Sequence, residues 1–270
     1  NSSAHKGGTV TTSRSWYSSC VECHDQEGFI EFTINGSGGT FYASDYSSPF
    51  TCGLCHGIHE NFDEADYALR LTAATVLKVG GNTVDFSADG NSNTCLQCHQ
   101  ARRGYDSYWD GAAATVDIGG HDGPHYGTQV NLLLGELGIA AGTAGTHATS
   151  SSLGQCVGCH MDNASPDGAG HSFSPVVDNC TACHAGATDF DVNGYVTDME
   201  ADLDALLVEL QALGILDAEG HLPEDDITIT SDQFQAWWNY TVVYLDHSKG
   251  VHNPVYATAL IDDAKTKLGI

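Results

Sequence analysis

The chain has 270 residues, and its 9 Lys and Arg residues against 35 Asp and Glu residues give a formal net charge of −26. So few basic residues cannot form the cationic face that binds nucleic acid or an anionic membrane surface, which argues against both kinds of partner. No apolar run approaches the roughly 20 residues that cross a bilayer, and the polar start of the chain favours a mature form from which a signal peptide has been removed.

The ten cysteine residues form five copies of one motif, Cys-x-x-Cys-His. In chain order, motifs 1 to 5 are Cys20, Cys23 and His24; Cys52, Cys55 and His56; Cys95, Cys98 and His99; Cys156, Cys159 and His160; and Cys180, Cys183 and His184. The motif is typical of c-type haem attachment, in which two thiols bond the vinyl groups and the histidine is the proximal iron ligand.

Zinc ribbons, dithiol redox sites and disulfide frameworks also contain Cys-x-x-Cys, but none of them requires the histidine that follows here. We therefore expect five covalently bound haems. Because covalent haem attachment takes place outside the cytoplasm, we also expect an extracellular, cell-surface or periplasmic protein.

Two apolar segments between the first three motifs predict β-hairpins. One runs from Phe29 to Ile34, turns at a Gly-rich stretch and returns over residues 40–42. The other joins residues 73–79 to residues 83–86 through Gly80 and Gly81. Neither carries obvious chemistry, so we expect both to cover haem edges or to make protein contacts.

The sixth iron ligand is expected to be histidine at most of the haems. Only Met161 and Met199 are present, and Met161 directly follows proximal His160, so it cannot reach the opposite face of that haem. Since methionine ligation raises the potential of a haem, its scarcity predicts low-potential, low-spin haems with two axial histidines. Five residues are the candidate distal ligands: His59, His125, His147, His171 and His252.

The first two candidates are chosen from their local sequence. His59 follows His56 by three residues, nearly one helical turn, so it should point toward a neighbouring haem instead of its own. Pro124 suits the first turn of a helix, which places His125 at a helix start.

The other three candidates lie near later motifs. His147 and His171 each precede the first cysteine of a motif by nine residues, an equal offset that suits ligation of an adjacent haem. His252 precedes a predicted helix that would fix its position. The remaining histidine residues, for which a solvated loop is the alternative interpretation, are His5, His121, His221 and His247.

Residues 189–200 match the calcium-loop pattern D-x-[DN]-x-[DN]-G-x5-E at every fixed position. The candidate calcium ligands are Asp189, Asp191, Asn193, Tyr195 and Glu200. The alternative is an acidic turn that caps the following helix, because no partner helix is predicted before this loop.

From about residue 197 the pattern becomes helical. Thr197 to Glu200 has the form of a capping box, leucine residues follow at helical spacing, and Gly214 suits the end of this helix. A second helix is predicted from Ser231, and a third ends near Leu268. The aromatic residues of the second helix are expected to form a haem-packing core, with an electron relay as the alternative interpretation.

The expected fold is a haem-cored multihaem cytochrome c, rich in coil, with short helices, small β-hairpins and a helical C-terminal section. With five motifs in 270 residues, the porphyrins must constitute much of the core, in a continuous chain suited to electron hopping. We expect one unit over residues 1–270, in which a helical section at 191–270 packs on a haem-attachment region at 1–190.

Three segments besides the motifs carry a family resemblance: Gly-Pro-His125 with Gln129, Gly170-His171-Ser-Phe173 before motif 5, and Ser-Lys-Gly-Val-His252-Asn-Pro. The chain resembles the secreted multihaem cytochromes of metal-respiring bacteria, which include extracellular cytochrome filaments, or nanowires. The resemblance implies electron transfer, subunits that repeat head to tail, and a histidine that can ligate a haem of the neighbouring subunit. His5 is the candidate for that intersubunit ligand.

The prediction is therefore an electron-transfer protein, not an enzyme, that forms a subunit of an extracellular filament and exchanges electrons with redox partner proteins or extracellular acceptors. A discrete periplasmic shuttle is the first alternative. A multihaem nitrite or hydroxylamine reductase is the second. It would need an open iron position, often marked by an unusual proximal ligand, whereas all five motifs end in histidine.

Overall fold

The computed structural model describes residues 3–6, 18–36, 48–86, 91–150, 154–161 and 170–270. The chain packs as two compact units. The first comprises Asn1–Thr75, Thr83–Cys98 and Ser151–Cys183, and the second comprises Val76–Asn82, His99–Ser150 and His184–Ile270. This division differs from the predicted boundary at residue 190, because residues 99–150 group with the C-terminal helices. Within the described residues no helix combines the length and apolar character needed to cross a membrane.

Short helices carry the Cys-x-x-Cys-His motifs in whole or in part. They are α1 (Ser18–His24), α3 (Cys52–Cys55), α4 (Asn93–Leu96), α7 (Gln155–His160) and α8 (Asp178–Thr181). Helices α4 and α8 contain only the first cysteine of their motifs. A helical turn brings residues three apart to the same face, so the two thiols of one motif can reach the same porphyrin edge.

The first predicted hairpin is wrong, because Gln26–Asn35 is helix α2. The carboxylate of Asp25 caps this helix by accepting the N–H of Gly28 at 2.8 Å, and Phe29 is buried. A short apolar run is compatible with a strand or a helix, and here the Asp25 cap at its start favours the helix. The predicted return strand at 40–42 lies outside the described residues.

The second predicted hairpin is confirmed, although its strands are shorter than expected. Strand β1 (Thr75–Val76) pairs with β2 (Thr83–Val84). The turn between them contains Gly80 and Gly81, whose φ values of 77° and 69° suit glycine.

The second unit contains a further antiparallel strand pair, formed by segments far apart in the chain, that the sequence did not predict. Strand β3 (Thr115–Ile118) pairs antiparallel with β4 (Ile227–Thr230), and Thr115 lies opposite Thr230. The short helices α5 (Gln129–Leu134) and α6 (Thr146–Thr149) belong to the same unit.

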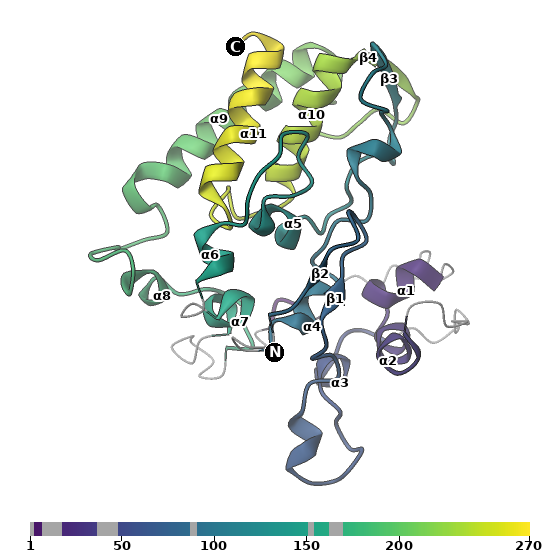
Figure 1. Cartoon of the computed structure of the whole chain (residues 1–270), viewed down its shortest axis with the longest axis vertical. Coiled ribbons are helices and arrows are strands. Elements are labelled where there is room, and N and C mark those ends of the chain that lie inside the picture. Colours follow the sequence, from purple (N-terminus) through teal and green to yellow (C-terminus); the bar gives the residue numbers. More distant parts are fainter. Residues whose placement is uncertain (1–2, 7–17, 37–47, 87–90, 151–153, 162–169) are drawn as a thin grey trace. The chain divides into compact units, whose positions relative to one another are not determined.

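Three longer helices complete the second unit and pack together, as Figure 1 shows: α9 (Tyr195–Ala212), α10 (Ser231–Tyr244) and α11 (Pro254–Leu268). All three were predicted. Helix α9 begins two residues earlier than expected, and its N-terminus is capped by Asp191 in place of the predicted capping box at Thr197 and Glu200.

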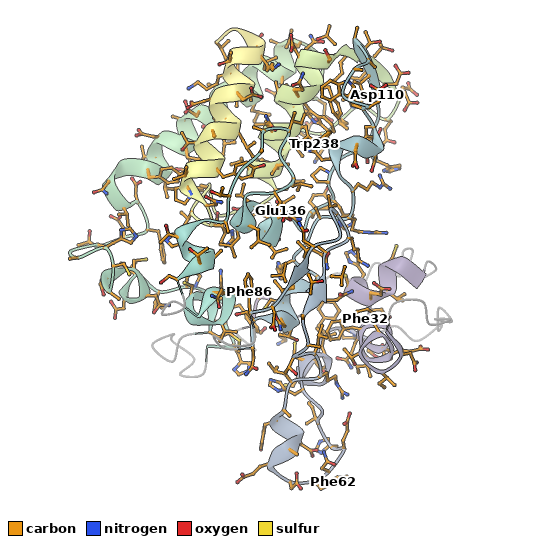
Figure 2. The ribbon with its side chains drawn as sticks, viewed as in Figure 1. Phe32, Phe62, Phe86, Asp110, Glu136 and Trp238 are labelled. Atoms are coloured by element: carbon orange, nitrogen blue, oxygen red, sulfur yellow. The ribbon has the colours of Figure 1, made fainter. Side chains whose placement is uncertain are left out.

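The core of the second unit is aromatic. Phe234, Trp237 and Trp238 of α10 are almost fully buried, with ring centres 5.7–6.0 Å apart. The indole of Trp238, labelled in Figure 2, donates its N–H to the carbonyl of Leu137 at 2.8 Å. The buried aromatic residues therefore act as packing groups between the helices.

Candidate haem centres

The cysteine residues are placed to hold a large apolar group. All ten lie in the described part of the chain, none of them in a disulfide, and none is buried: Cys52 and Cys183 are exposed and the others are half-buried. Cysteine that is not otherwise engaged is among the most buried residue types. The exposed side chains of Cys52 and Cys183 fit covalent attachment of a porphyrin edge that covers them.

Two of the motif histidine residues, His56 and His160, are oriented through their Nδ1 atoms. His56 Nδ1 lies 2.7 Å from the carbonyl of Tyr67, and His160 Nδ1 lies 2.9 Å from the carbonyl of Phe173. Because a carbonyl can only accept, Nδ1 must carry the proton, and Nε2 is left with a lone pair for a metal. Ligating histidines in metalloproteins are held in the same manner.

A third motif histidine, His99, is held by a side-chain amide. His99 Nδ1 lies 3.3 Å from Oε1 of Gln129, and the amide nitrogen of Gln129 donates to the carbonyls of Leu245 and Asp246 at 3.2 and 3.3 Å. Those two carbonyls fix the orientation of the amide, so its oxygen faces His99. Because that oxygen can only accept, the proton of the neutral imidazole is on Nδ1 and the lone pair is on Nε2.

Two of the predicted distal ligands show the same arrangement. His147 Nδ1 lies 2.7 Å from the carbonyl of Val251, and His252 Nδ1 lies 2.6 Å from the carboxylate of Asp246, whose side chain is fully buried. The second contact is the carboxylate–histidine arrangement that makes a ligand more basic. Both side chains can therefore offer Nε2 to an iron.

Two histidine pairs have the spacing of axial ligands on one metal. The ring centres of His56 and His171 are 6.2 Å apart, and those of His184 and His147 are 6.4 Å apart. An imidazole–metal bond of about 2.0 Å and a nitrogen-to-centre distance of about 1.1 Å put two such rings about 6.2 Å apart. Each pair joins a motif histidine to one of the predicted distal ligands.

The loop after motif 2 carries His59 and is organised by Asp66. The carboxylate of Asp66 accepts the N–H groups of His59, Glu60, Asn61 and Phe62 at 2.7–3.1 Å. The bond from Asn61 and those from its neighbours hold the pKa of Asp66 below its ordinary value. The His59 ring is exposed beside Phe62, which Figure 2 labels at the outer end of this loop.

His125 lies in a turn and not at a helix start, because helix α5 begins only at Gln129. Its φ of 72° is in the left-handed region, and its half-buried ring lies beside Tyr126. Pro124 therefore belongs to this turn, and its carbonyl accepts the N–H of Arg102.

His5 packs within its own chain. Its half-buried ring meets Phe173 edge-on, with ring centres 4.4 Å apart, and the neighbouring Ala4 donates to the carbonyl of Ser172. Burial lowers the pKa of His5, which favours the neutral form that a metal needs. To ligate a haem of a second subunit, His5 would have to leave this contact.

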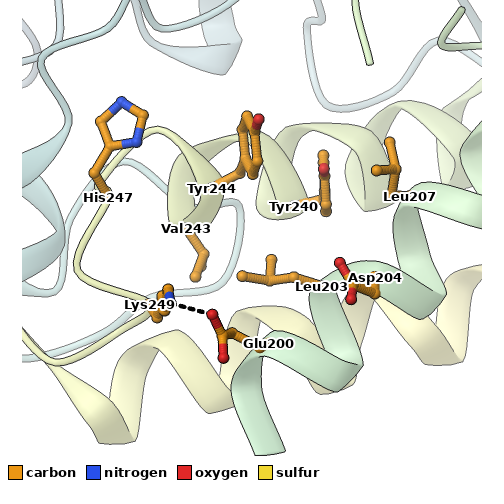
Figure 3. A pocket seen from close by; sticks show the side chains of 9 residues that line it. All are labelled: Glu200, Leu203, Asp204, Leu207, Tyr240, Val243, Tyr244, His247 and Lys249. Carbon is orange, nitrogen blue, oxygen red and sulfur yellow. Dashed lines mark hydrogen bonds and ion pairs between the residues drawn. The ribbon is translucent and has the colours of Figure 1, made fainter. Parts of the chain in front are cut away.

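The remaining histidine residues lie at the surface. His121, His221 and His247 are exposed. The N–H of His221 is held by Asp217 in an acidic turn, as the solvated-loop interpretation expects. His247 borders a groove of about 210 Å³ between α9 and α10, shown in Figure 3. This groove is smaller than usual small-molecule sites and contains no motif residue.

The loop at 189–200 has the geometry of a helix cap. Asp191 accepts the N–H groups of Val196 and Thr197 at 2.7 and 3.1 Å and the Thr197 hydroxyl at 2.6 Å. Glu200, which the calcium pattern requires as a ligand, forms an ion pair with Lys249. Among the described residues, no group of three or more His, Cys, Asp or Glu side chains is arranged to hold a metal ion. The structure thus favours the capping interpretation over calcium.

Several residues that orient the ligands were not predicted. Asp246 and the carbonyls of Tyr67, Phe173 and Val251 hold histidine Nδ1 atoms, but they lie between 6 and 104 positions from their partners. A backbone carbonyl leaves no signal in the sequence. Asp246 and Gln129 hold a histidine Nδ1 atom with their side chains, and of these two only Gln129 belongs to a segment that the sequence marks, the one that begins with Gly-Pro-His125.

No protein-family model matches the chain, and no curated protein sequence does. Two solved structures share its fold. Outer cell wall cytochrome OcwA matches with a TM-score of 0.61 and 20% identity, over 99% of this chain and 49% of OcwA. An undecahaem cytochrome from the S-layer of Carboxydothermus ferrireducens matches with a TM-score of 0.57 and 18% identity, over 98% of this chain and 40% of that protein. This chain therefore has a multihaem cytochrome fold and spans less than half the length of either structure.

Proposed function

We propose that this chain is an electron-transfer protein that holds five c-type haems, most of them low-spin with two axial histidines. The observation that carries the proposal is the spacing of His56 to His171 and of His184 to His147, at 6.2 and 6.4 Å between ring centres. A haem supplies one-electron redox chemistry, and the protein supplies its position, its ligands and its surroundings.

The axial ligands are assigned from these contacts, with haems 1 to 5 numbered as their motifs. His171 is the distal ligand of haem 2, and His147 is the distal ligand of haem 5. For the other three haems the candidates are His59, His125 and His252, with His5 as a further candidate. His252 is the best supported of these, because the buried carboxylate of Asp246 holds its Nδ1 atom.

We further propose that the protein works at the cell exterior. Covalent haem attachment takes place outside the cytoplasm, and the two cytochromes that share this fold come from an outer cell wall and an S-layer. Its partners would be redox proteins or extracellular electron acceptors. An electron-transfer role without catalysis is supported by the five motif histidines, which leave no unusual proximal ligand to mark an open iron.

The first test is the haem content and spin state of the purified, haem-loaded protein. We expect five haems per chain by haem-to-protein ratio and wholly low-spin ferric iron by EPR. Fewer than five haems would contradict the motif assignment. A high-spin signal from one haem in five would indicate an open site and would favour the reductase alternative, which nitrite and hydroxylamine turnover would then test.

The second test concerns assembly, for which we propose a head-to-tail filament. The net charge of −26 opposes self-association, so assembly should strengthen as added salt screens that repulsion. Electron micrographs and light scattering over a salt series should show fibres. A protein that stays monomeric at every salt concentration would be a discrete shuttle instead.

A further inference from the structure

The peptides of motifs 1 and 3 are in direct contact, although 75 positions separate Glu22 from Gln97. The thiol of Cys23 donates to the carbonyl of Gln97 at 3.3 Å, and the thiol of Cys98 lies 4.0 Å from the carbonyl of Glu22. Between these two reciprocal contacts, the side-chain amide of Gln97 donates to the Glu22 carboxylate at 3.2 Å. Glu22 and Gln97 are both buried.

The thiols themselves also meet across motifs. The thiol of Cys98 is hydrogen-bonded to that of Cys23. The thiol of Cys95 is hydrogen-bonded to that of Cys156. Motif 3 therefore has one thiol against motif 1 and the other against motif 4.

The contact between motifs 3 and 4 includes their backbones. The hydroxyl of Ser92, at the start of the helix that carries motif 3, accepts the N–H of Val157 at 3.1 Å and donates to the carbonyl of Gly154 at 3.2 Å. Ser92 is fully buried. One hydroxyl thus joins the two motif helices, α4 and α7.

One further contact places motif 5. The side-chain amide of Asn179, beside Cys180 in motif 5, donates to the carbonyl of Cys159 in motif 4 at 3.0 Å. Motif 5 is therefore next to motif 4.

We infer that haem 3 is a junction at which the vinyl edges of haems 1 and 4 converge, with haem 5 reached through haem 4. The inference rests on the proposed five haems, because the cysteine contacts locate only the edges to which haems attach. The electron path then does not follow the order of the motifs in the sequence, because haem 2 does not stand between haems 1 and 3. Haem 1 exchanges electrons with haem 4 through haem 3.

Glu22 gives the junction a property that can be measured. Its buried carboxylate lies between the cysteine pairs of motifs 1 and 3, so its charge acts on both haems. A negative charge close to a haem disfavours reduction, and burial weakens the screening of that charge by solvent. Glu22→Gln should therefore raise two of the five one-electron potentials, and Gln97 can still bond the new amide oxygen.

The direct test is a crystal structure of the haem-loaded protein in which anomalous scattering locates the irons. We expect the irons of haems 1 and 4 each to have the iron of haem 3 as a near neighbour, and the iron of haem 5 to be nearest to that of haem 4. Irons that succeed one another in motif order, 1-2-3-4-5, would overturn the inference. Fewer than five irons would instead overturn the proposed function on which it rests.

The solution test is spectroelectrochemistry of Glu22→Gln beside a matched control. Glu31→Gln removes the same charge from helix α2, where the side chain is only half-buried, and should leave all five potentials unchanged. Two raised potentials in Glu22→Gln support the junction. If one potential or none moves while haem content and spin state are unaltered, haems 1 and 3 do not share this carboxylate and the junction is wrong.

Discussion

The imidazole rings of His56 and His171 lie 6.2 Å apart between centres, with their planes inclined by 48°. His56 is fixed from behind by the carbonyl of Tyr67, which leaves its Nε2 for a metal. The two histidine residues are 115 positions apart in the chain, and nothing in the sequence links motif 2 to the segment before motif 5. The pair is the most direct indication of how the fold completes a haem site.

His171→Ala should leave haem 2 without its distal ligand. We expect one haem in five to become high-spin in the ferric protein, because its iron then lacks the sixth ligand. EPR and absorbance spectra of the purified variant measure the high-spin fraction. His221→Ala, at an exposed histidine held in an acidic turn, is the matched control and should stay wholly low-spin. Low-spin spectra for His171→Ala would show that another residue ligates haem 2.

Asp246→Asn should raise the potential of one haem. The Asp246 carboxylate is 2.6 Å from His252 Nδ1 and fully buried, so its charge stabilises the ferric iron that His252 would ligate. Asparagine keeps an oxygen acceptor and removes the charge. Substitution of a residue that hydrogen-bonds a metal ligand typically changes metal affinity about tenfold or more. If the affinity for the ferric iron alone changes tenfold, the one-electron potential changes by about 59 mV. We therefore expect one of five potentials to rise by about 60 mV.

Redox titration followed by absorbance measures this shift. Asp232→Asn is the control, because Asp232 is an exposed partner of Lys267 on the same unit. It removes the same charge and should leave all five potentials unchanged. An unchanged titration for Asp246→Asn would mean that His252 is not a haem ligand.

The haem motifs could be predicted because each is local: five consecutive residues contain both thiols and the proximal histidine. The helices α9, α10 and α11 could be predicted for a similar reason, since apolar periodicity and terminal residues such as Thr230 and Asn253 lie in one short segment. Helix α2 was missed because a run such as Phe29 to Ile34 fits either secondary structure. The side chain of Asp25 resolves the ambiguity.

The partners of the ligands could not be predicted, because they depend on tertiary structure. The carbonyl of Val251 holds His147 from 104 positions away, and Gln129 meets His99 across 30 positions. His59 and His171 were equal candidates in the sequence. The structure separates them by their neighbours: the loop organised by Asp66 places the ring of His59 beside Phe62, whereas the ring of His171 lies opposite His56.

Asp191→Ala should destabilise helix α9 in a pH-dependent way. The Thr197 hydroxyl and N–H, together with the Val196 N–H, hold the pKa of Asp191 below its ordinary value. A carboxylate with a lowered folded-state pKa contributes stability above its unfolded pKa of about 3.9, and loses it as the pH falls through the folded value. The variant should therefore have a lower Tm than the native protein at pH 7, and the difference should vanish in acid.

Calorimetry at a series of pH values measures this effect. Asp198→Ala is the matched control, because Asp198 is an exposed acid in the first turn of the same helix. Added calcium should leave the Tm of the native protein unchanged, because Asp191 and Glu200 are engaged in the cap and in the ion pair with Lys249. A calcium-dependent rise in Tm that Asp191→Ala abolishes would establish the calcium loop and overturn the capping interpretation.

Substitution of Trp238 separates a packing role from an electron relay. The side chain is fully buried among Phe234, Trp237 and the core of the second unit, and its N–H bonds the Leu137 carbonyl. Trp238→Ala should lower the free energy of unfolding by about 3–5 kcal/mol. Trp238→Phe retains most of the packing and should cost about 1–3 kcal/mol, since a buried carbonyl loses its partner. Denaturant titration followed by tyrosine and tryptophan signals measures both values.

The rate of electron transfer decides between the two roles. If Trp238 only packs, Trp238→Phe should be reduced at the native rate in stopped-flow experiments, despite its lower stability, because the haems alone carry the electrons. Tyr244→Phe, at the exposed end of the same helix, provides the control. A Trp238→Phe protein with native stability and slowed reduction would show the opposite, that the indole takes part in the transfer and that the aromatic cluster of α10 is a relay.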